Sequence, residues 1–356
     1  MIQARLRRQF PAGPDSTAFS LDVEVSTNSG ITALFGPSGS GKTLTLDCIA
    51  GFVRPSEGRI LLDDQILFDA QTGVNVPPRR RRCGYVFQDY ALFPHMTLRQ
   101  NLAFAAEMWP RLERHRRIAE MLEKFRLTDL AGRKPHELSG GQKQRCSIAR
   151  ALIGGPKVLL LDEPAAGLDV PLQAELFEIL RQVRAEFGIP MLLVTHSMDE
   201  CFALADEMLI LHEGRVVQNG PPAKVCDHPV NLAVARLLGI YNILPVEIRT
   251  LDPSRNTSVL RYGDFDIGGE YYPGRLRGDH IHLAVAPQQL KAVPKEGKFA
   301  SHQMPAQLLR VIEAPQAARL EFAGGLHVEM PRGDYERSRH VKEWAIEFPA
   351  RSLRVL

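Results

Sequence analysis

The sequence predicts an α/β domain with a mostly parallel sheet, followed by an all-β domain. Up to about residue 230, short runs of Val, Leu and Ile alternate with helical patterns, which is typical of a parallel sheet covered on both faces. After about Gly239 the helical periodicity fades, and short alternating segments are separated by turn residues every ~8–12 positions. This change in sequence pattern predicts one domain at residues 1–235 and a second at 236–356.

The strands expected in the first domain are short apolar runs that end in polar or glycine-rich turns. They are GITALFG (30–36), CGYVFQ (83–88), KVLLLDEP (157–164), PMLLVTHS (190–197) and DEMLILHEGRVV (206–217). Helices are expected over KTLTLDCIAGF, directly after the first of these strands, and over residues 172–187. Residues 1 to about 30 and 58–68 alternate more regularly and predict a separate antiparallel layer.

The second domain divides around a connector, PKEGKFASHQM (294–304). Two β units of similar length are expected on either side of it, at about 240–294 and 302–356. Turn spacing of this kind favours a small barrel or a pair of barrels.

Charge and cysteine content narrow the class of protein. The formal net charge of the 356 residues is +3, so no strong basic field points to nucleic acid. The densest charge is the run Arg79–Arg82, which is expected to be a solvated face. Five cysteines without a CxxC pair favour reduced thiols over a disulfide framework or a zinc site.

The chain carries no apolar run near the ~18 residues of a membrane helix, and its N-terminus lacks the apolar stretch of a secretory signal. If the protein works at a membrane, a partner must hold it there.

A glycine-rich turn between the first buried strand and the first helix carries the clearest chemistry. GPSGSGKT fits the P-loop pattern in the strand-to-helix context that this motif requires. Its glycines allow backbone N–H groups to turn toward an anion, and the positive end of the helix points to the same place. The expected phosphate-binding residues are Gly36, Pro37, Ser38, Gly39, Ser40, Gly41, Lys42 and Thr43. Lys42 would neutralise the β and γ phosphates, and the Thr43 hydroxyl would bind Mg²⁺.

A second element ends the strand KVLLLDEP with two adjacent carboxylates. Asp162 is placed to support a Mg²⁺ ion, and Glu163 is placed to polarise an attacking water, as a general base or by orienting it. Together with the P-loop, this pair predicts a nucleoside triphosphatase.

The motif LSGGQKQR narrows that class. Here the sequence resembles the ATP-binding cassette (ABC) family, whose signature LSGGQ matches Leu138, Ser139, Gly140, Gly141 and Gln142. Ser139 is expected to cap the following helix, and the two glycines would let a γ-phosphate approach its N-terminus. The resemblance covers roughly residues 1–235 and implies an ABC cassette with a helical subdomain at about 89–150, followed by an OB-like β tail.

The same resemblance assigns further residues. Gln88 matches the glutamine that reaches the metal and the attacking water. Thr43 and Gln88 are therefore the expected Mg²⁺ ligands, and Asp162 is expected to contact these ligands rather than the metal itself. Asp169, in AAGLD, matches the aspartate of the D-loop, and His196 matches the histidine that contacts the γ-phosphate. An aromatic residue stacks on adenine in this family, for which Phe10 is the candidate and Phe19 the alternative.

The family resemblance also implies how the protein would work. ATP and Mg²⁺ are the expected ligands, and each ATP would lie between Lys42 of one chain and Ser139 of a second copy, so a homodimer with two composite sites is expected. Hydrolysis would drive transmembrane permease subunits, docked on the helical subdomain at the cytoplasmic face of the inner membrane, and these in turn receive substrate from a binding protein. No nucleic-acid partner is expected.

The expected direction of transport follows from the β tail, and the expected substrate follows from one long segment. A cassette followed by a β tail resembles importer ATPases, and residues 67–104 resemble the ATPases of molybdate importers in amino-acid sequence and in the spacing of their motifs. The tail departs from those proteins at VAPQQL (285–290) and at ASHQMPAQL (300–308), where an Arg-Pro-Glu and a Ser-x-Arg-Asn run are common. Molybdate or a related oxyanion is the expected substrate, with importers of sulfate, phosphate, iron or polyamines as alternatives.

The sequence disfavours two other classes of protein. A soluble ABC ATPase acting on nucleic acid would usually carry two cassettes or a long coiled-coil insertion, and this sequence shows neither. A regulatory module that has lost catalysis is disfavoured by the intact Lys42, Glu163 and His196.

Overall fold

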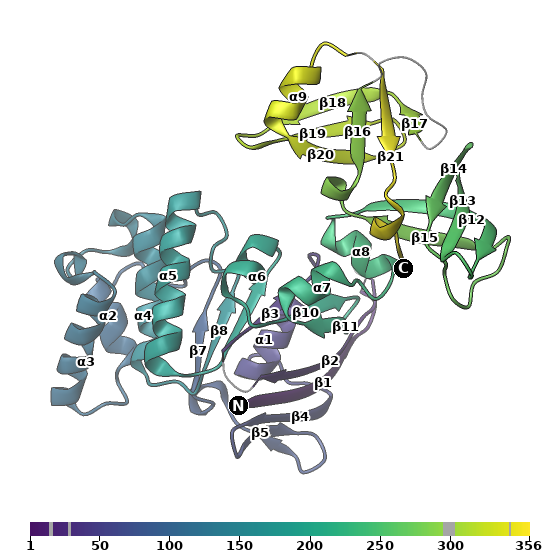
Figure 1. The fold of residues 1–356 in the computed structure, drawn as a ribbon. Coiled ribbons are helices and arrows are strands. Elements are labelled where there is room, and N and C mark those ends of the chain that lie inside the picture. Colours follow the sequence, from purple (N-terminus) through teal and green to yellow (C-terminus); the bar gives the residue numbers. More distant parts are fainter. Residues whose placement is uncertain (14–16, 28–29, 295–302, 342) are drawn as a thin grey trace. The chain divides into compact units, whose positions relative to one another are not determined.

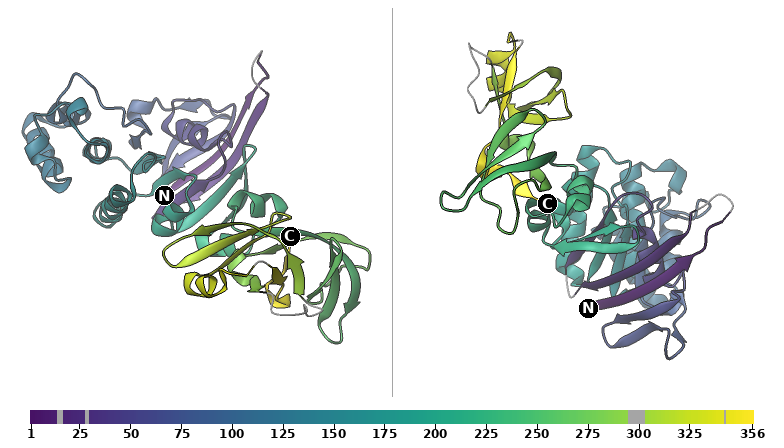
Figure 2. Two further views of the ribbon diagram at one scale, coloured as in Figure 1. Left: turned by 90° about the horizontal axis from the view of Figure 1, so that it is seen from above. Right: turned by 90° about the vertical axis from the view of Figure 1, so that its right-hand side faces the viewer.

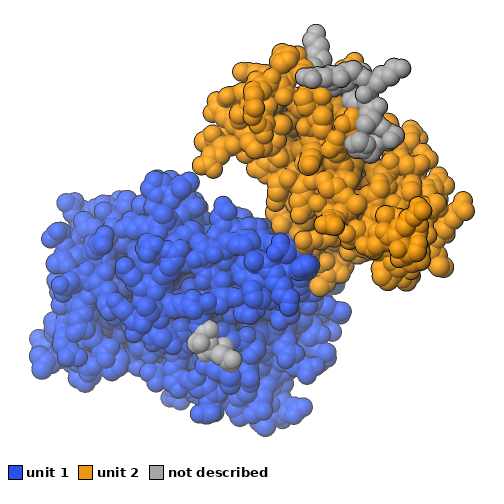
Figure 3. All heavy atoms as spheres, in the orientation of Figure 1, with its two compact units in different colours: residues 1–228 blue, residues 229–356 orange. Residues whose placement is uncertain are grey.

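The structure is a computed structural model that describes residues 1–13, 17–27, 30–294, 303–341 and 343–356. The chain forms two compact units, Met1–His228 and Pro229–Leu356, which Figure 3 shows in different colours. Each unit has its own hydrophobic core and is described by itself.

The strands of unit 1 join into one sheet. Their bounds are β1 Ile2–Phe10, β2 Phe19–Thr27, β3 Ile31–Phe35, β4 Glu57–Leu62, β5 Gln65–Asp69, β6 Val74–Asn75, β7 Cys83–Val86, β8 Val158–Asp162, β9 Met191–Thr195, β10 Glu207–His212 and β11 Arg215–Gly220. Among the described residues this sheet has eleven strands, in the order β6-β5-β4-β1-β2-β11-β10-β3-β9-β8-β7 (Figure 1).

The two halves of the sheet differ in direction. From β10 through β3, β9 and β8 to β7 every neighbouring pair is parallel, and every residue of β3, β8 and β9 is buried. In the other half every pair is antiparallel except β2–β11, and its longest pair is β1–β2, which appears in purple in both views of Figure 2. The predicted antiparallel layer is therefore present, but it is not separate, because β2 pairs with β11 at Asp22 and Arg215.

The stretch 206–217, expected as a single strand, is in fact most of a hairpin. β10 and β11 pair antiparallel around a turn at Glu213 and Gly214, both with positive φ (48° and 75°). Gly214 is required there, since a Cβ at this position would lie 2.0 Å from the carbonyl oxygen of Ser20. The apolar runs are interrupted at His212–Arg215, and the Glu-Gly pair at the centre of that interruption is the turn that the prediction of a single strand overlooked.

Seven α-helices accompany the sheet in the described part of unit 1. They are α1 Lys42–Ala50, α2 Leu98–Ala105, α3 Arg111–Lys124, α4 Gly140–Ile153, α5 Val170–Phe187, α6 Met198–Leu204 and α7 Pro222–Asp227. Short 3₁₀ turns lie at Pro78–Arg80, Thr128–Leu130 and Pro135–Glu137. None of the helices in the described ranges of the chain is long and apolar enough to cross a membrane.

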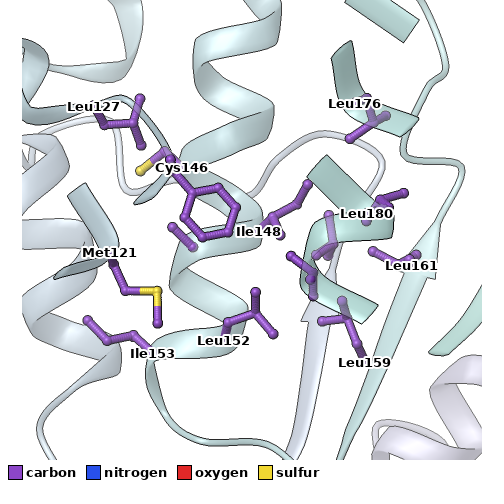
Figure 4. Close-up of a cluster of buried hydrophobic side chains, with 14 of the residues drawn as sticks. Met121, Leu127, Cys146, Ile148, Leu152, Ile153, Leu159, Leu161, Leu176 and Leu180 are labelled. Carbon is purple, nitrogen blue, oxygen red and sulfur yellow. The ribbon is translucent and has the colours of Figure 1, made fainter. Parts of the chain in front are cut away.

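A continuous apolar core joins the helical subdomain to the parallel sheet. Figure 4 shows Met121 of α3 beside Ile153 and Leu152 of α4, and Leu180 of α5 beside Leu161 of β8; Leu176 and Leu159 belong to the same buried cluster. These side chains are at most 6% exposed. The helix α4, which follows the LSGGQ motif, is thus packed between α3 and the sheet, and its position is fixed by burial of apolar area.

The arginine run 79–82 does not form a uniformly solvated face. Arg79, Arg80 and Arg82 are exposed, but Arg81 is fully buried, which corrects the prediction for that residue. Its guanidinium donates to the carbonyl oxygens of Cys48 (2.8 Å), Ile49 (2.9 Å) and Val76 (2.7 Å) and to Oδ1 of Asn75 (2.9 Å). A positive charge therefore caps the C-terminal end of α1, where the helix dipole is negative.

Unit 2 consists mainly of strands, as predicted, with two helices in its described residues. Its elements are α8 Leu232–Leu238, β12 Asn242–Asp252, β13 Thr257–Tyr262, β14 Phe265–Gly269, β15 His280–Val285, β16 Lys291–Pro294, β17 Gln303–Ala306, β18 Leu308–Glu313, β19 Ala317–Phe322, β20 His327–Pro331, α9 Arg332–Ser338, β21 Trp344–Glu347 and β22 Arg354–Val355, with 3₁₀ turns at Pro287–Gln289 and Ala350–Ser352.

The strands of unit 2 form three sheets, ordered β14-β13-β12-β15-β22, β16-β21-β17 and β18-β19-β20. β22 lies at the end of the chain yet pairs with β15, and β16 pairs with β21, so the pairings cross the division expected at about 294–302. Asn242 ties the first sheet to the third, since its side chain donates to the carbonyl oxygen of His327 (2.8 Å) and accepts from the backbone N–H of His327 (2.7 Å). Most of the connector, and residues 300–302 of the tail segment noted above, lie outside the described residues.

Candidate nucleotide site

The P-loop leaves the buried strand β3 and runs directly into α1. Gly39 and Gly41 have φ of 79° and 101°, and Gly41 is the N-cap of α1. At Gly36 a Cβ would lie 2.2 Å from the carbonyl oxygen of Leu211, so the loop can pass this strand only without a side chain. The loop thus has the backbone conformation and the helix N-terminus that bind phosphate.

Lys42 is folded back over its own loop. Its side chain is 6% exposed, and Nζ donates to the carbonyl oxygens of Gly36 (2.8 Å) and Pro37 (2.9 Å). Burial lowers the pKa of Lys42, while the nearby carboxylates of Glu163 and Asp162 oppose that shift. The ammonium is therefore held beside the loop, where a phosphate oxygen can replace the carbonyls as its partner.

Thr43 and Asp162 form the junction between the P-loop and β8. The Thr43 hydroxyl donates to Oδ1 of Asp162 at 3.0 Å. Burial raises the pKa of Asp162, and the hydrogen bond from Thr43 counteracts this effect. An exposed hydroxyl held against a buried carboxylate is a suitable anchor for Mg²⁺, which takes its remaining ligands from phosphates and water.

Glu163 and His196 meet at the ends of adjacent strands. Glu163 follows β8 with a φ of 45°, a left-handed conformation that is unusual for a residue with a side chain. Nδ1 of His196, directly after β9, lies 3.3 Å from Oε2 of Glu163. The histidine is 66% exposed and the glutamate 22%, so the pair faces outward and can reach a ligand. Backbone strain of this kind is frequent at functional sites.

The P-loop and Glu163 border a cavity of about 350 Å³. It is lined by Phe19, Ser38, Gly39, Gly41, Lys42, Thr43, Leu44 and Glu163. Of the two aromatic candidates, the structure brings Phe19 to the P-loop. Phe10 is not among the lining residues and packs behind Phe19, with ring centroids 6.4 Å apart.

The LSGGQ motif lies at the start of α4, away from that lining. Ser139 caps the helix, since its Oγ accepts from the backbone N–H of Gln142 at 3.3 Å, and Oε1 of Gln142 accepts from the backbone N–H of Ser139 at 3.0 Å. The capping role expected for Ser139 is therefore observed. Gly140 and Gly141 form the first turn, and neither they nor Ser139 line the P-loop cavity.

Two other predicted residues also lie outside the lining. Gln88 is exposed just after β7. Asp169 caps α5, and its Oδ1 accepts from the backbone N–H of Leu172 at 3.0 Å. Within one chain, hydrogen bonds, an ion pair and the cavity lining link the P-loop, Asp162, Glu163 and His196. Among the described residues, the signature, Gln88 and Asp169 are not part of that lining.

Three titratable residues near this site were not singled out from the sequence. Asp47 lies one helical turn beyond Thr43, Tyr85 lies near the end of β7, and Glu200 is buried in α6. Thr43 and Asp47 are four residues apart and so lie on one face of the helix, a spacing that could have revealed Asp47 from the sequence. In the described part of the chain, no group of three or more His, Cys, Asp or Glu side chains is arranged to hold a metal ion.

The fold and the site together define a P-loop nucleotide-binding cassette. The family model described as ABC transporter matches residues 20–166. The chain is 38% identical over 279 residues to the spermidine/putrescine import ATP-binding protein PotA of Vibrio cholerae, an alignment that covers 76% of this chain and 71% of that protein. The chain belongs to the ABC transporter family.

Other relatives are similar over a shorter stretch. The molybdenum import ATP-binding proteins ModC of Paramagnetospirillum magneticum and Rhodospirillum rubrum are 44% and 43% identical over 211 and 212 residues, or 59% and 60% of this chain. The chain spans only 58% and 57% of the lengths of these two relatives.

Among solved structures, a dimeric bacterial ABC cassette, MJ0796, is 28% identical with a TM-score of 0.54 and covers 62% of this chain and 99% of its own. CbiO1 of Clostridium perfringens is 30% identical with a TM-score of 0.55 and covers 67% of this chain and 98% of its own.

Proposed function

We propose that this chain hydrolyses ATP and that the energy drives uptake of a substrate through a membrane permease. The observation that carries the proposal is the cavity at the P-loop, where Lys42, Thr43 and Glu163 converge. Lys42 and Thr43 are suited to bind phosphates and a metal, and Glu163 is suited to activate water. The family supports the same reaction.

The residues of this chain divide the work. Backbone N–H groups of the loop and Lys42 would hold the β and γ phosphates, and Phe19 would stack on the adenine in place of Phe10. The hydroxyl of Thr43 and Gln88 would hold Mg²⁺, with Asp162 fixing the Thr43 hydroxyl at 3.0 Å. When bound, the metal neutralises charge on the phosphates.

Glu163 is the group that would act on water. Its carboxylate is partly buried and borders the cavity, so it can orient a water molecule against the γ-phosphate and accept its proton. His196, 3.3 Å away, would contact the γ-phosphate and keep the carboxylate in place. Removal of the negative charge, as in Glu163→Gln, should stop turnover while phosphate binding continues.

A second copy of the chain would complete each site. The cavity at the P-loop contains no residue of the signature, so Ser139, Gly140, Gly141 and Gln142 are available to a nucleotide on a partner chain. Asp169, at the start of α5, would lie at the same interface. The dimeric state described for the ATP-binding cassette MJ0796, bound to ADP and Pi after hydrolysis, supports this arrangement.

The partners proposed beyond the dimer are permease subunits and, through them, a substrate-binding protein. The helical subdomain, with α2 and α3, would dock the permease and place the chain peripherally at the cytoplasmic face of the membrane. Phe104, Met108 and Leu112 are exposed apolar side chains there, which suits contact with another protein.

Molybdate or a related oxyanion is the proposed substrate, because the cassette is 44% identical to a molybdenum import protein. A polyamine is the second candidate, since the alignments with polyamine import proteins reach 83% of this chain and therefore extend into unit 2.

The test of the function has two parts. The full chain should co-purify with a permease encoded beside it and hydrolyse ATP, whereas ATPase activity that responds only to nucleic acid would overturn the proposal. In the reconstituted transporter, ATPase activity should rise with a molybdate-loaded binding protein. Stimulation by spermidine alone would select the second candidate, and stimulation by sulfate or iron alone would reject both.

A further inference from the structure

Behind the P-loop, a tyrosine hydroxyl lies between two carboxylates on different elements. Tyr85 of β7 donates to Oδ1 of Asp47 in α1 at 3.1 Å. The pKa of Tyr85 is raised, first by burial and then by the charges of Asp162 and Asp47. The hydroxyl therefore interacts with both carboxylates, although it has only one proton to donate.

An aromatic stack fixes the position of that hydroxyl. The Tyr85 ring lies on Phe87, with centroids 4.2 Å apart and planes 27° apart, and Phe52 packs against both rings. Phe87 immediately precedes Gln88, so the same stack holds the start of the segment that carries Gln88. A tyrosine held on its ring faces places its polar end reproducibly.

Asp47 is oriented toward the nucleotide end of α1. It lies four residues after Thr43, one turn or about 6 Å along the helix, and therefore on the same face as the hydroxyl that bonds to Asp162. Side chains four residues apart are neighbours on a helix surface, so the charge of Asp47 acts on the pair formed by Thr43 and Asp162. Asp47 is thus a third carboxylate near the base of the site, in addition to Asp162 and Glu163.

The charge balance of this group favours a divalent cation. Counted together, the carboxylates of Asp47, Asp162 and Glu163 and the ammonium of Lys42 give a formal net charge of −2. Two carboxylates that interact in a partly buried place repel each other, and a metal ion at Thr43 and Asp162 relieves that repulsion. A nucleotide without metal brings three or four further negative charges and is repelled.

We propose that Asp47, held by Tyr85, is a positioning residue of the Mg²⁺ site that makes nucleotide binding depend on the metal. The inference rests on the proposed nucleotide site. It assigns to Asp47 no direct contact with the metal or the nucleotide, and its charge acts through Asp162 and Thr43. Loss of that charge should have opposite effects on binding with metal and without it.

The experiment compares ADP binding to the full chain by calorimetry, in Mg²⁺ and in EDTA. Asp47→Asn should bind ADP more weakly in Mg²⁺ and more tightly in EDTA, each by on the order of fivefold, so that the ratio of the two dissociation constants falls more than tenfold. Asp47→Glu should restore much of the ratio. Tyr85→Phe, which keeps the ring stack but releases Asp47, should give an intermediate ratio.

A matched control removes one negative charge by the same substitution at a site away from the P-loop. Asp64 lies exposed between β4 and β5, and Asp64→Asn should leave the ratio unchanged. A general loss of structure would weaken binding in both buffers, and such a result for Asp47→Asn would overturn the inference, as would an unchanged ratio. If the unaltered chain binds no ADP in either buffer, the proposed nucleotide site itself fails.

Discussion

The buried guanidinium of Arg81 offers a quantitative test of how α1 is held. Arg81→Met keeps an apolar stem of similar length but removes four hydrogen bonds. The carbonyl oxygens of Cys48 and Ile49 belong to fully buried residues, so water cannot easily replace the lost donors. At ~1–3 kcal/mol for each unsatisfied buried acceptor, the free energy of unfolding of unit 1 should fall by about 2–6 kcal/mol.

Differential scanning calorimetry of the full chain can measure this change. For a domain the size of unit 1, about 2–4 °C per kcal/mol corresponds to a fall of roughly 4–24 °C in its midpoint. Arg81→Lys keeps the charge but loses the planar guanidinium with its several donors, so its midpoint should lie between those of the unaltered chain and Arg81→Met. Arg80→Met is the control, because Arg80 is an exposed neighbour in the same run. Equal, small shifts for Arg81→Met and Arg80→Met would refute the assignment of Arg81 as the cap of α1.

Three further outcomes are expected. Glu163→Gln should lower phosphate release at least 100-fold while ATP-dependent dimers persist in light scattering, and near-normal release would remove Glu163 from its role. Phe19→Ala should weaken ATP binding on the order of fivefold, while Phe10→Ala changes it less than about twofold, and the reverse order would restore Phe10 as the adenine partner. Burial raises the pKa of Glu200, with the charge of Glu163 adding to the shift and Thr195 and His196 opposing it. The pKa of Glu200 in the folded state therefore lies above its unfolded value of about 4.3, and the folded protein loses stability as the pH rises from about 4.3 through the folded pKa. Glutamine cannot ionise, so Glu200→Gln should raise the melting midpoint at pH 8 but not at pH 4. An equal shift at both pH values would contradict this.

The parallel sheet and the P-loop were predictable because each depends on local sequence. The run Val158–Leu161 is apolar throughout, as expected for a strand covered on both faces, and GPSGSGKT between a strand and a helix is specific for a P-loop. The hairpin of β10 and β11 was missed although the polar stretch His212–Arg215 separates two apolar runs, because a two-residue turn at Glu213 and Gly214 leaves only a short break in the pattern.

What the sequence could not give depends on contacts between distant residues. Arg81 is buried because acceptors from α1 and from the β6 segment converge on it, which a run of four arginines does not reveal. The position of Phe19 beside the P-loop likewise depends on tertiary contacts: Phe10 and Phe19 are opposite each other in β1 and β2, and only Phe19 lines the cavity. In unit 2, the pairing of β22 with β15 links residues about 70 apart in sequence, beyond the reach of periodicity.

The most direct test of the account asks whether two chains share each nucleotide. Lys42→Ala disables the P-loop and Ser139→Arg blocks the signature, so each variant alone should be nearly inactive. In an equal mixture, half of the dimers formed at random contain one chain of each kind, and one of their two sites combines an intact Lys42 with an intact Ser139. ATP hydrolysis should therefore return to about a quarter of the unaltered rate. A mixture as inactive as its components, although mixed dimers form, would contradict the composite site.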